Sequence, residues 1–294
     1  MNKKAGVGLF ISIISVSTAA ILIRSVSENV PPLTIAFYRL LFTVLLITPI
    51  FLIYKKFRQE ILNIDKRTFS LIILIGVILS LHFAFWITSL DFTSVASSVI
   101  LVTAHPVLVA PIAYYFLKEK LSIVNIIGIV ISIIGVVILV FGNYDLGPLS
   151  IDSLEGNIFA ILGGIFAGLY ILGGRKVRKT VSVVPYAFVV YLTSTILLFF
   201  MCLFTNSKII GLETKDLEIL LLMAFISGIL GHTVYNWSLK YIRASVASVA
   251  LLGEPVGSTI LAVIILSEIP SSFTLIGGIV IITGIYLTSK NSKT

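Results

Sequence analysis

Charged side chains are scarce in this sequence, and their scarcity decides which solvent surrounds the protein. Asp, Glu, Lys and Arg make up 12% of the 294 residues, whereas hydrophobic residues make up 58%. A soluble domain of average composition is about a quarter charged and about half apolar, and a single core cannot bury this much apolar surface. The composition therefore excludes a water-soluble globular protein and predicts an integral membrane protein.

Other absences narrow the class of function. The chain has one cysteine, Cys202, so no intrachain disulfide can form. It has no P-loop that could bind a nucleotide, and its three histidines lack the HExxH spacing of zinc hydrolases. We therefore expect no enzymatic activity, no metal site and no cofactor. The net charge of +8 comes from basic residues in short segments between apolar runs, which argues against nucleic acid as a partner.

Long apolar runs fill most of the chain. A helix needs about 20 such residues to cross about 30 Å of hydrocarbon. The first run follows Lys3 and Lys4 and is long for a signal peptide, so we expect it to remain as a helix. The sequence predicts an all-α integral membrane protein with ten transmembrane helices. These predicted helices cover residues 6–23, 33–54, 69–90, 95–117, 123–141, 156–174, 185–204, 217–239, 244–266 and 273–287.

Basic residues predict the orientation, because lysine and arginine concentrate in cytoplasmic loops. If the N-terminus is cytoplasmic, nearly all of the 21 lysine and arginine residues fall in cytoplasmic segments. The exceptions are Arg24, Lys208 and Lys215, which fall on the outer side. Arg39 lies within a span. We therefore expect a multi-pass protein of the cell (plasma or inner) membrane, embedded in the lipid bilayer, with both termini in the cytoplasm.

The sequence repeats itself at an offset of 149 residues. At this offset residues 89–141 align without a gap with residues 238–290. Aliphatic matches mean little in a membrane protein, but proline, glutamate and glycine also coincide. The pairs of matched residues are Pro106 with Pro255, Glu119 with Glu268, Gly128 with Gly277, and Gly135 with Gly284.

This repeat divides the chain into two five-helix units, residues 1–145 and 150–294. Because five is an odd number, consecutive units must cross the membrane in opposite senses. Two inverted five-helix repeats are the architecture of many secondary transporters, whose site lies near mid-membrane between the halves.

Several residues and short stretches in each half are notable, and most of them, though not Arg39, have a counterpart in the other half. In the first half they are Arg39, the run Trp86–Thr93, Pro106, Glu119, Gly128 and Gly135. In the second half they are the run Tyr235–Tyr241, Glu254, Pro255, Glu268, Gly277 and Gly284. In order and spacing they resemble the EamA family of the drug/metabolite transporter superfamily, over residues 6–141 and 156–287. The resemblance implies ten helices, cytoplasmic termini and movement of metabolites, often export of amino acids or related compounds.

This chain departs from the family pattern at two places. His105 precedes the first-half proline, where an uncharged residue is expected. Val190 occupies the position equivalent to Arg39, so the two halves are chemically unequal.

Glu254 and His105 are the sharpest candidates for function, because an ionisable group within the bilayer costs about 2.5–3.5 kcal/mol and is a functional candidate by default. They are equivalent in the repeat, and each directly precedes a proline, Pro255 or Pro106. Both lie roughly 15 Å deep at 1.5 Å per residue. The prolines are expected to kink their helices and free a carbonyl. Glu254 either binds a substrate ammonium group or takes up a proton; the alternative is a carboxyl that only holds the kinked helix. His105 either lines the cavity or makes a packing hydrogen bond.

Three further groups complete the predicted substrate site. Arg39 suits a substrate carboxylate, because its planar guanidinium matches that group; the alternatives are a structural pair with Asp91 or Glu254, or snorkelling to the interface. Two pairs of residues share a helix face and either line the cavity or make interhelical hydrogen bonds. These pairs are His82 with Trp86, and His232 with Tyr235.

Other polar and small residues are expected to have structural roles. Glu119 and Glu268 fall in the turns between the fourth and fifth helices of each half, where each is expected to cap the following helix or to act as a gate latch. Glycines in helix interiors are expected to mark close helix contacts. They are Gly128, Gly135, Gly163, Gly164 and Gly168.

These features favour a secondary transporter, an exporter of a small metabolite, driven by a gradient through alternating access around a mid-membrane cavity. Arg39 and Glu254 together suit a zwitterion such as an amino acid, and Glu254 offers a route to proton coupling. The alternatives are a passive channel and a membrane scaffold that transports nothing.

Overall fold

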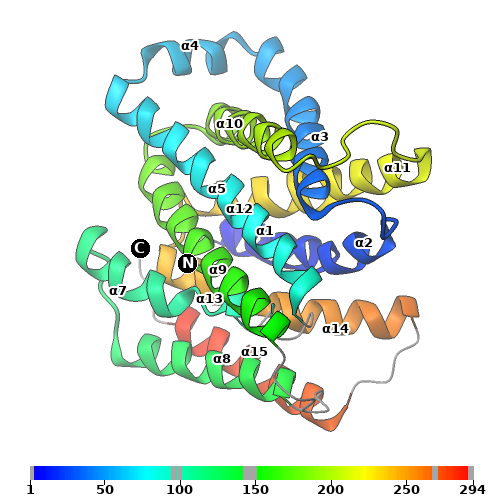
Figure 1. Ribbon diagram of the computed structural model, residues 1–294. Coiled ribbons are helices and arrows are strands. Elements are labelled where there is room, and N and C mark those ends of the chain that lie inside the picture. Colours follow the sequence, from blue (N-terminus) through cyan, green and yellow to red (C-terminus); the bar gives the residue numbers. More distant parts are fainter. Residues whose placement is uncertain (1–2, 94–97, 99–100, 142–150, 267–270, 291–294) are drawn as a thin grey trace.

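The computed structural model describes residues 3–93, 98, 101–141, 151–266 and 271–290. Every regular element in this part of the chain is a helix (Figure 1). The helices are α1 Lys3–Ser17, α2 Ala19–Ser25, α3 Pro32–Ile53, α4 Lys55–Asn63, α5 Lys66–Phe92, α7 Pro106–Phe116, α8 Ile123–Phe141, α9 Ile151–Arg178, α10 Val183–Phe204, α11 Thr214–Met223, the π-helix η1 Ala224–Thr233, α12 Val234–Ser238, α13 Ala244–Ala250, α14 Gly253–Leu266 and α15 Ser272–Lys290.

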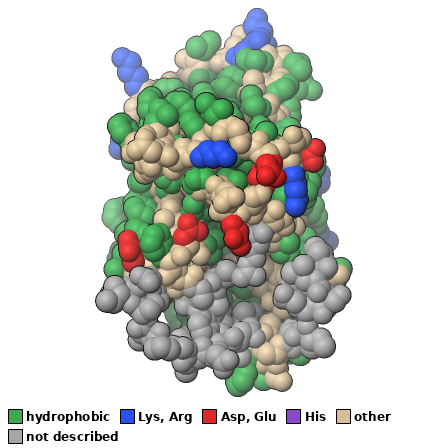
Figure 2. All heavy atoms as spheres, turned by 45° about the vertical axis from the view of Figure 1, so that its right-hand side comes forward, with side chains coloured by type: hydrophobic (Ala, Val, Ile, Leu, Met, Phe, Trp, Pro, Cys, Tyr) green, Lys and Arg blue, Asp and Glu red, His purple; other side chains and the backbone are tan. Residues whose placement is uncertain are grey.

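The helices provide the predicted membrane spans. Within the described ranges, eight helical stretches are long and apolar enough to cross a membrane, and two shorter apolar helices cover Leu101–Phe116 and Ile123–Ile138. Each of these coincides with one predicted span. Large apolar side chains such as Phe10 and Ile279 point outward, and the face in Figure 2 shows many hydrophobic side chains among few charged ones. The prediction of an all-helical membrane protein is confirmed.

Helices of the two halves pack against each other in pairs. The extensive contacts between the halves join α8 to α15, α5 to α9, α3 to α10, α5 to α10, α1 to η1, and α3 to η1. α7 also packs against α13. Each pair joins a helix of the first half of the sequence to a helix of the second. If every helix is replaced by its equivalent in the other half, the same set of pairs results. The boundary between residues 145 and 150 therefore divides the sequence but does not separate two independent cores.

Glycines make the closest of these crossings possible. A Cβ added at Gly284 of α15 would lie 2.6 Å from the carbonyl oxygen of Gly128 on α8, and one added at Gly135 would lie 2.9 Å from the carbonyl oxygen of Gly277. Such distances exclude any side chain, so the backbones are in direct contact. The interpretation of Gly128 and Gly135 as helix-contact residues is confirmed.

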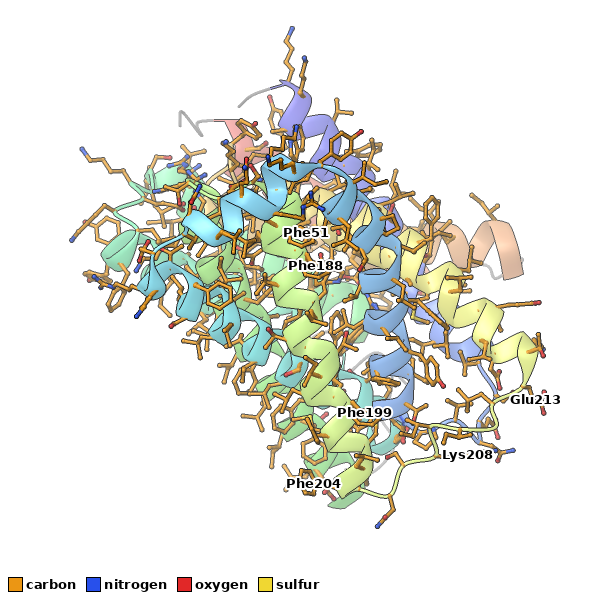
Figure 3. All side chains as sticks on the ribbon, turned by 90° about the horizontal axis from the view of Figure 1, so that it is seen from above. Phe51, Phe188, Phe199, Phe204, Lys208 and Glu213 are labelled. Atoms are coloured by element: carbon orange, nitrogen blue, oxygen red, sulfur yellow. The ribbon has the colours of Figure 1, made fainter. Side chains whose placement is uncertain are left out.

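Aromatic side chains hold α3 against α10 on another side of the molecule. The rings of Phe51 and Phe188 are stacked with centroids 4.2 Å apart (Figure 3). At the other end of these helices, the loop from Lys208 to Glu213 follows α10, and the carbonyl oxygens of Lys208 and Ile209 accept hydrogen bonds from Thr34 and Tyr38 of α3. The two helices are therefore joined at both ends.

Several spans are interrupted near their middle. The first is divided at Thr18, between α1 and α2. Residues 101–103 are helical, a turn follows at residues 104–105, and α7 then begins at Pro106. In the same way a turn at residues 251–252 separates α13 from α14, which carries Pro255 in its first turn. Proline has no N–H to continue the helical pattern, and it tolerates only the first turn of a helix well.

The span Thr214–Ser238 contains a change of helix type that the sequence did not predict. Its residues Ala224–Thr233 form a π-helix, and α12 follows directly. A π-helix widens the turn and changes the direction in which later side chains point. Here it sets the direction of His232.

The capping role expected for Glu119 is wrong. The start of α8 is capped by Ser122 and Asn125, whose side chains each bond to the other's backbone N–H, at 3.2 and 3.0 Å respectively. Glu119 instead reaches the start of α13 in the other half. The local spacing that suggested capping could not predict this contact, because Glu119 and α13 are distant in the sequence. Glu268 lies outside the described residues.

Candidate functional site

A cavity of ≈ 730 Å³, a volume that includes space open to the outside, lies among the interrupted helices. It is lined by residues of both halves, and the lining includes all seven residues named above as substrate-binding candidates. Those residues are Arg39, His82, Trp86, His105, His232, Tyr235 and Glu254. They come from α3, α5, the start of α7, η1, α12 and α14. The fold therefore brings together a set of polar residues that the sequence disperses over more than 200 positions.

Arg39 is the most deeply buried charged residue of this lining, with 1% of its surface exposed. Its guanidinium lies over the ring of Phe83, 4.4 Å from the ring centroid. Its Nε and Nη1 atoms have no hydrogen-bond partner. The predicted alternative of a direct ion pair with Asp91 or Glu254 is not found, because Asp91 is exposed at the end of α5 and no ion pair of Arg39 is present in the described part of the chain.

His82 and Trp86 form one wall of the cavity. They lie one turn apart on α5, and their rings are parallel within 4° with centroids 5.9 Å apart. His82 Nδ1 donates a hydrogen bond of 2.9 Å to the carbonyl oxygen of Gly163 on α9. Because a carbonyl only accepts, Nε2 of the neutral ring is left as a hydrogen-bond acceptor. The indole N–H of Trp86 is buried and has no partner.

His105 and Glu254 lie at the interruptions of the fourth and ninth spans. His105 is the residue before α7, is 7% exposed, and its Nδ1 has no partner. Glu254 lies in the first turn of α14. Its backbone oxygen accepts a hydrogen bond of 3.1 Å from Ser17, at the interruption of the first span. The interruptions of the first and ninth spans are therefore joined at Glu254.

His232 and Tyr235 are three positions apart, on the two sides of the junction between the π-helix and α12. The rings of His232 and Phe83 form an edge-to-face pair with centroids 5.4 Å apart, and Phe83 also contacts Arg39. The hydroxyl of Tyr235 is buried without a partner.

In the part of the chain that the structure describes, five buried polar atoms without a hydrogen-bond partner belong to residues that line this cavity, whereas others, such as the hydroxyls of Ser132 and Tyr186, lie elsewhere. The five atoms are Arg39 Nε and Nη1, Trp86 Nε1, His105 Nδ1 and the hydroxyl of Tyr235. A buried polar group without a hydrogen bond costs about 1–3 kcal/mol, more if it is charged, and such groups are few in a folded protein. Their concentration around one space indicates a site for a polar solute. Among the described residues, no three His, Cys, Asp or Glu side chains are placed to hold a metal ion.

Tyr170 belongs to the site although the sequence analysis gave it no particular role. It lines the cavity from α9, and its hydroxyl accepts a hydrogen bond of 2.5 Å from Asn236. Asn236 also donates to Tyr191, at 3.2 Å, and the hydroxyl of Tyr191 lies 3.1 Å from that of Thr233. These partners lie on three helices, so no local pattern in the sequence marks them as a network. The one signal in the sequence was that Asn236 directly follows Tyr235, a residue predicted to line the cavity.

Interrupted membrane helices around a cavity that carries several polar side chains are the architecture of a membrane transporter. The sequence profile of the EamA-like transporter family matches residues 3–141 and 154–290. The chain belongs to the EamA-like transporter family, which is a family of transporters and not of enzymes. The predicted family is therefore confirmed.

Two relatives and one solved structure agree with this assignment. The chain is 27% identical over 293 residues to an uncharacterized transporter of Archaeoglobus fulgidus, covering 98% of each protein. It is 24% identical over 213 residues to an uncharacterized transporter of Clostridium kluyveri, covering 70% of this chain and 67% of the relative. A crystal structure with 19% identity superposes with a TM-score of 0.79 over 99% of this chain and 98% of the other, which shows the same fold.

Proposed function

We propose that this transporter exports a small zwitterionic metabolite, an amino acid or a related compound, by alternating access around the central cavity. The observation that carries the proposal is the guanidinium of Arg39, which is almost fully buried, faces the cavity and has two nitrogen atoms without a partner. A substrate carboxylate would supply the missing acceptors in a geometry that guanidinium suits well.

Glu254 supplies the complementary charge. It lines the same cavity from the opposite half of the sequence, at the start of α14. A substrate ammonium group and a proton would compete for its carboxylate. Such competition links substrate release to proton uptake, which lets a proton gradient drive transport.

Alternating access is supported by the way the two halves pack. The principal helix pairs are unchanged when the halves are exchanged, and each half of the sequence holds five predicted spans. Two inverted repeats related in this way can adopt two equivalent arrangements that open the cavity to opposite sides. The distribution of lysine and arginine supports cytoplasmic N- and C-termini in the cell membrane.

The first experiment is a ligand screen. Purified protein is heated with amino acids, amines, carboxylic acids, sugars and nucleotides, and ligands that raise the unfolding temperature are selected, because a ligand stabilises the state it binds. The selected compound is then tested for saturable counterflow in liposomes. Stabilisation by zwitterions, but not by matched amines or carboxylic acids, supports the proposal. A flux that neither saturates nor shows counterflow identifies a channel, and no flux with any ligand identifies a scaffold.

Two substitutions test the assigned roles. Arg39→Gln should weaken substrate binding roughly tenfold or more, since a hydrogen bond to a charged group contributes about 1.5–3 kcal/mol. Glu254→Gln should remove the dependence of transport on the pH gradient. Glu218→Gln, which changes an exposed carboxylate on α11, is the matched control. If Glu254→Gln keeps the wild-type rate and pH profile, the role given to this carboxyl is wrong.

A further inference from the structure

A polar cluster joins the two halves of the chain beyond one end of the cavity. It begins where α7 ends. Lys118 adopts a left-handed backbone conformation with φ 56°, and the N–H of Glu119 donates to the carbonyl oxygen of Ala113 at 3.1 Å. This is a standard way to end a helix. It turns the chain so that Glu119 points inward, where only 6% of its surface is exposed.

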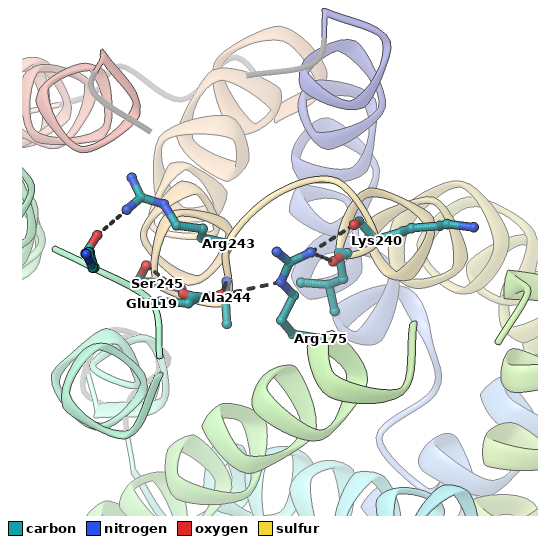
Figure 4. A network of polar contacts seen from close by, with 8 residues as sticks. Glu119, Arg175, Lys240, Arg243, Ala244 and Ser245 are labelled. Carbon is teal, nitrogen blue, oxygen red and sulfur yellow. Dashed lines mark hydrogen bonds and ion pairs between the residues drawn. The ribbon is translucent and has the colours of Figure 1, made fainter. Parts of the chain in front are cut away.

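The carboxylate of Glu119 accepts hydrogen bonds from four donors of the second half (Figure 4). Oε1 accepts from the N–H of Ala244 at 2.8 Å and from Nε of Arg175 at 3.4 Å. Oε2 accepts from the N–H and the hydroxyl of Ser245, at 3.2 and 3.0 Å. This carboxylate of the first half therefore caps α13 of the second half and pairs with the end of α9.

Two arginines extend the cluster. Nη1 of Arg175 donates to the carbonyl oxygens of Leu239 and Lys240, at 2.6 and 2.8 Å. Nη1 of Arg243 donates to the carbonyl oxygen of Lys120 (Figure 4). As a result, three segments that meet at this end are cross-linked by polar bonds: the turn after α7, the end of α9, and the link between α12 and α13.

The cluster lies one helical turn from the cavity. Leu239, whose carbonyl Arg175 holds, donates its N–H to the carbonyl oxygen of the cavity residue Tyr235. Leu239, Ala244 and Ser245 are fully buried, so packed protein surrounds the cluster at this end of the molecule. The neighbouring segments carry the basic loops that mark the expected cytoplasmic face.

The cluster is also connected directly to the two interruptions. Glu119 follows α7, which starts after His105, and Ser245 lies on α13, which ends shortly before Glu254. A change of angle at either interruption moves one partner of this cluster relative to the other. A substrate that changed either angle on binding would therefore act on the bonds of Glu119.

We propose that Glu119 and Arg175 are positioning residues that form a latch, which holds the cavity closed toward the basic face and must open and re-form in each transport cycle. The proposal rests on the transport function inferred above. Its chemistry suits a reversible contact. Every bond of the latch is polar, and carboxylate, guanidinium and backbone groups are all well solvated when the face opens to water. Apolar packing of the same extent would oppose that opening instead.

The test measures from which side water reaches the cavity. In a Cys202→Ala background, Ala167→Cys places one thiol on the cavity wall. A membrane-impermeant maleimide is applied to right-side-out and to inside-out vesicles. Glu119→Gln should raise the labelling rate from the basic face roughly tenfold, the change expected for the loss of one charged hydrogen bond. The exposed Glu218→Gln serves as the matched control and should leave the labelling unchanged.

Milder variants keep the test decisive if Glu119→Gln fails to fold. Ser245→Ala removes one donor and Arg175→Gln removes the ion pair, so both should raise labelling from the basic face, with the larger increase for Arg175→Gln. Equal labelling from that face in wild type and in all folded variants, with only their unfolding temperatures lowered, would show a purely structural cap and overturn the latch.

The labelling does not require transport, so the two proposals fail separately. Changed sidedness in a protein without counterflow would support the closing contact of Glu119 with Arg175 but reject both the transport mechanism and the cycling of this contact. Normal counterflow with unchanged sidedness of labelling would support the transport mechanism and reject the latch.

Discussion

The imidazole Nδ1 of His82 donates a hydrogen bond of 2.9 Å to the carbonyl oxygen of Gly163, and this bond joins α5 to α9 at the wall of the cavity. The two helices approach closely at the same place, since a Cβ added at Gly163 would lie 3.1 Å from the backbone nitrogen of Trp86. One polar bond and one glycine therefore set the distance between a helix of the first half and a helix of the second.

His82→Ala should destabilise the protein by about 0.5–1.5 kcal/mol for the lost hydrogen bond, with a further loss because Trp86 loses its stacking partner. His82→Asn should lose less, because its side-chain amide can still donate from near the Nδ1 position. Thermal unfolding of the purified protein measures both. Equal unfolding temperatures for the two variants would show that the bond to Gly163 contributes nothing.

Gly284→Ala should destabilise the contact of α8 with α15 by about 1–3 kcal/mol, the usual cost of overpacking. The added methyl would lie 2.6 Å from the carbonyl oxygen of Gly128, so the backbones must separate. Gly278→Ala on the same helix is the matched control, because its Cβ would lie 3.8 Å from the nearest atom, on Val256. That variant should be neutral or slightly stabilising, since alanine favours helix more than glycine does. If both variants unfold at the same temperature, the close crossing is not a constraint.

Asp65 caps the start of α5, and its contribution to the stability of the protein should depend on pH. Hydrogen bonds from the side chain and the backbone N–H of Thr68 lower the pKa of the Asp65 carboxyl below its ordinary value. A carboxyl whose pKa is lower in the folded state stabilises that state above its unfolded pKa of about 3.9, and this contribution is lost as the pH falls through the folded value. Asp65→Asn keeps a good capping residue that does not titrate. The wild type should therefore lose more unfolding temperature than Asp65→Asn between neutral and acidic pH, and parallel curves would contradict the assignment.

Local patterns were sufficient to predict the membrane spans. Apolar runs of the required length lie between short basic segments, and the described helices fall on the same residues. The repeat offset also predicted that His105 and Glu254 would occupy equivalent places, and the structure puts both at an interruption before a proline. Scarcity made the site residues conspicuous, since few ionisable groups occur inside the spans.

Contacts between distant segments were not predictable in this way. The π-helix that contains His232 packs against α1 and α3, and no residue spacing signals it. Glu119 has a serine three residues later and was expected to cap its own neighbour, yet its carboxylate bonds to Ala244 and Ser245. A capping pattern describes only what lies within one turn of the chain.

The sequence by itself determined that this protein is built of membrane-spanning helices in two related halves and belongs to a transporter family, because hydrophobic length and repetition act along the chain. Only the tertiary structure decided that Arg39 and Glu254 share one cavity, that two guanidinium nitrogens of Arg39 are buried there without a partner, and that Glu119 bonds to the other half. Those relationships depend on which helices pack together, and packing is decided by the whole set of contacts at once rather than by any single segment.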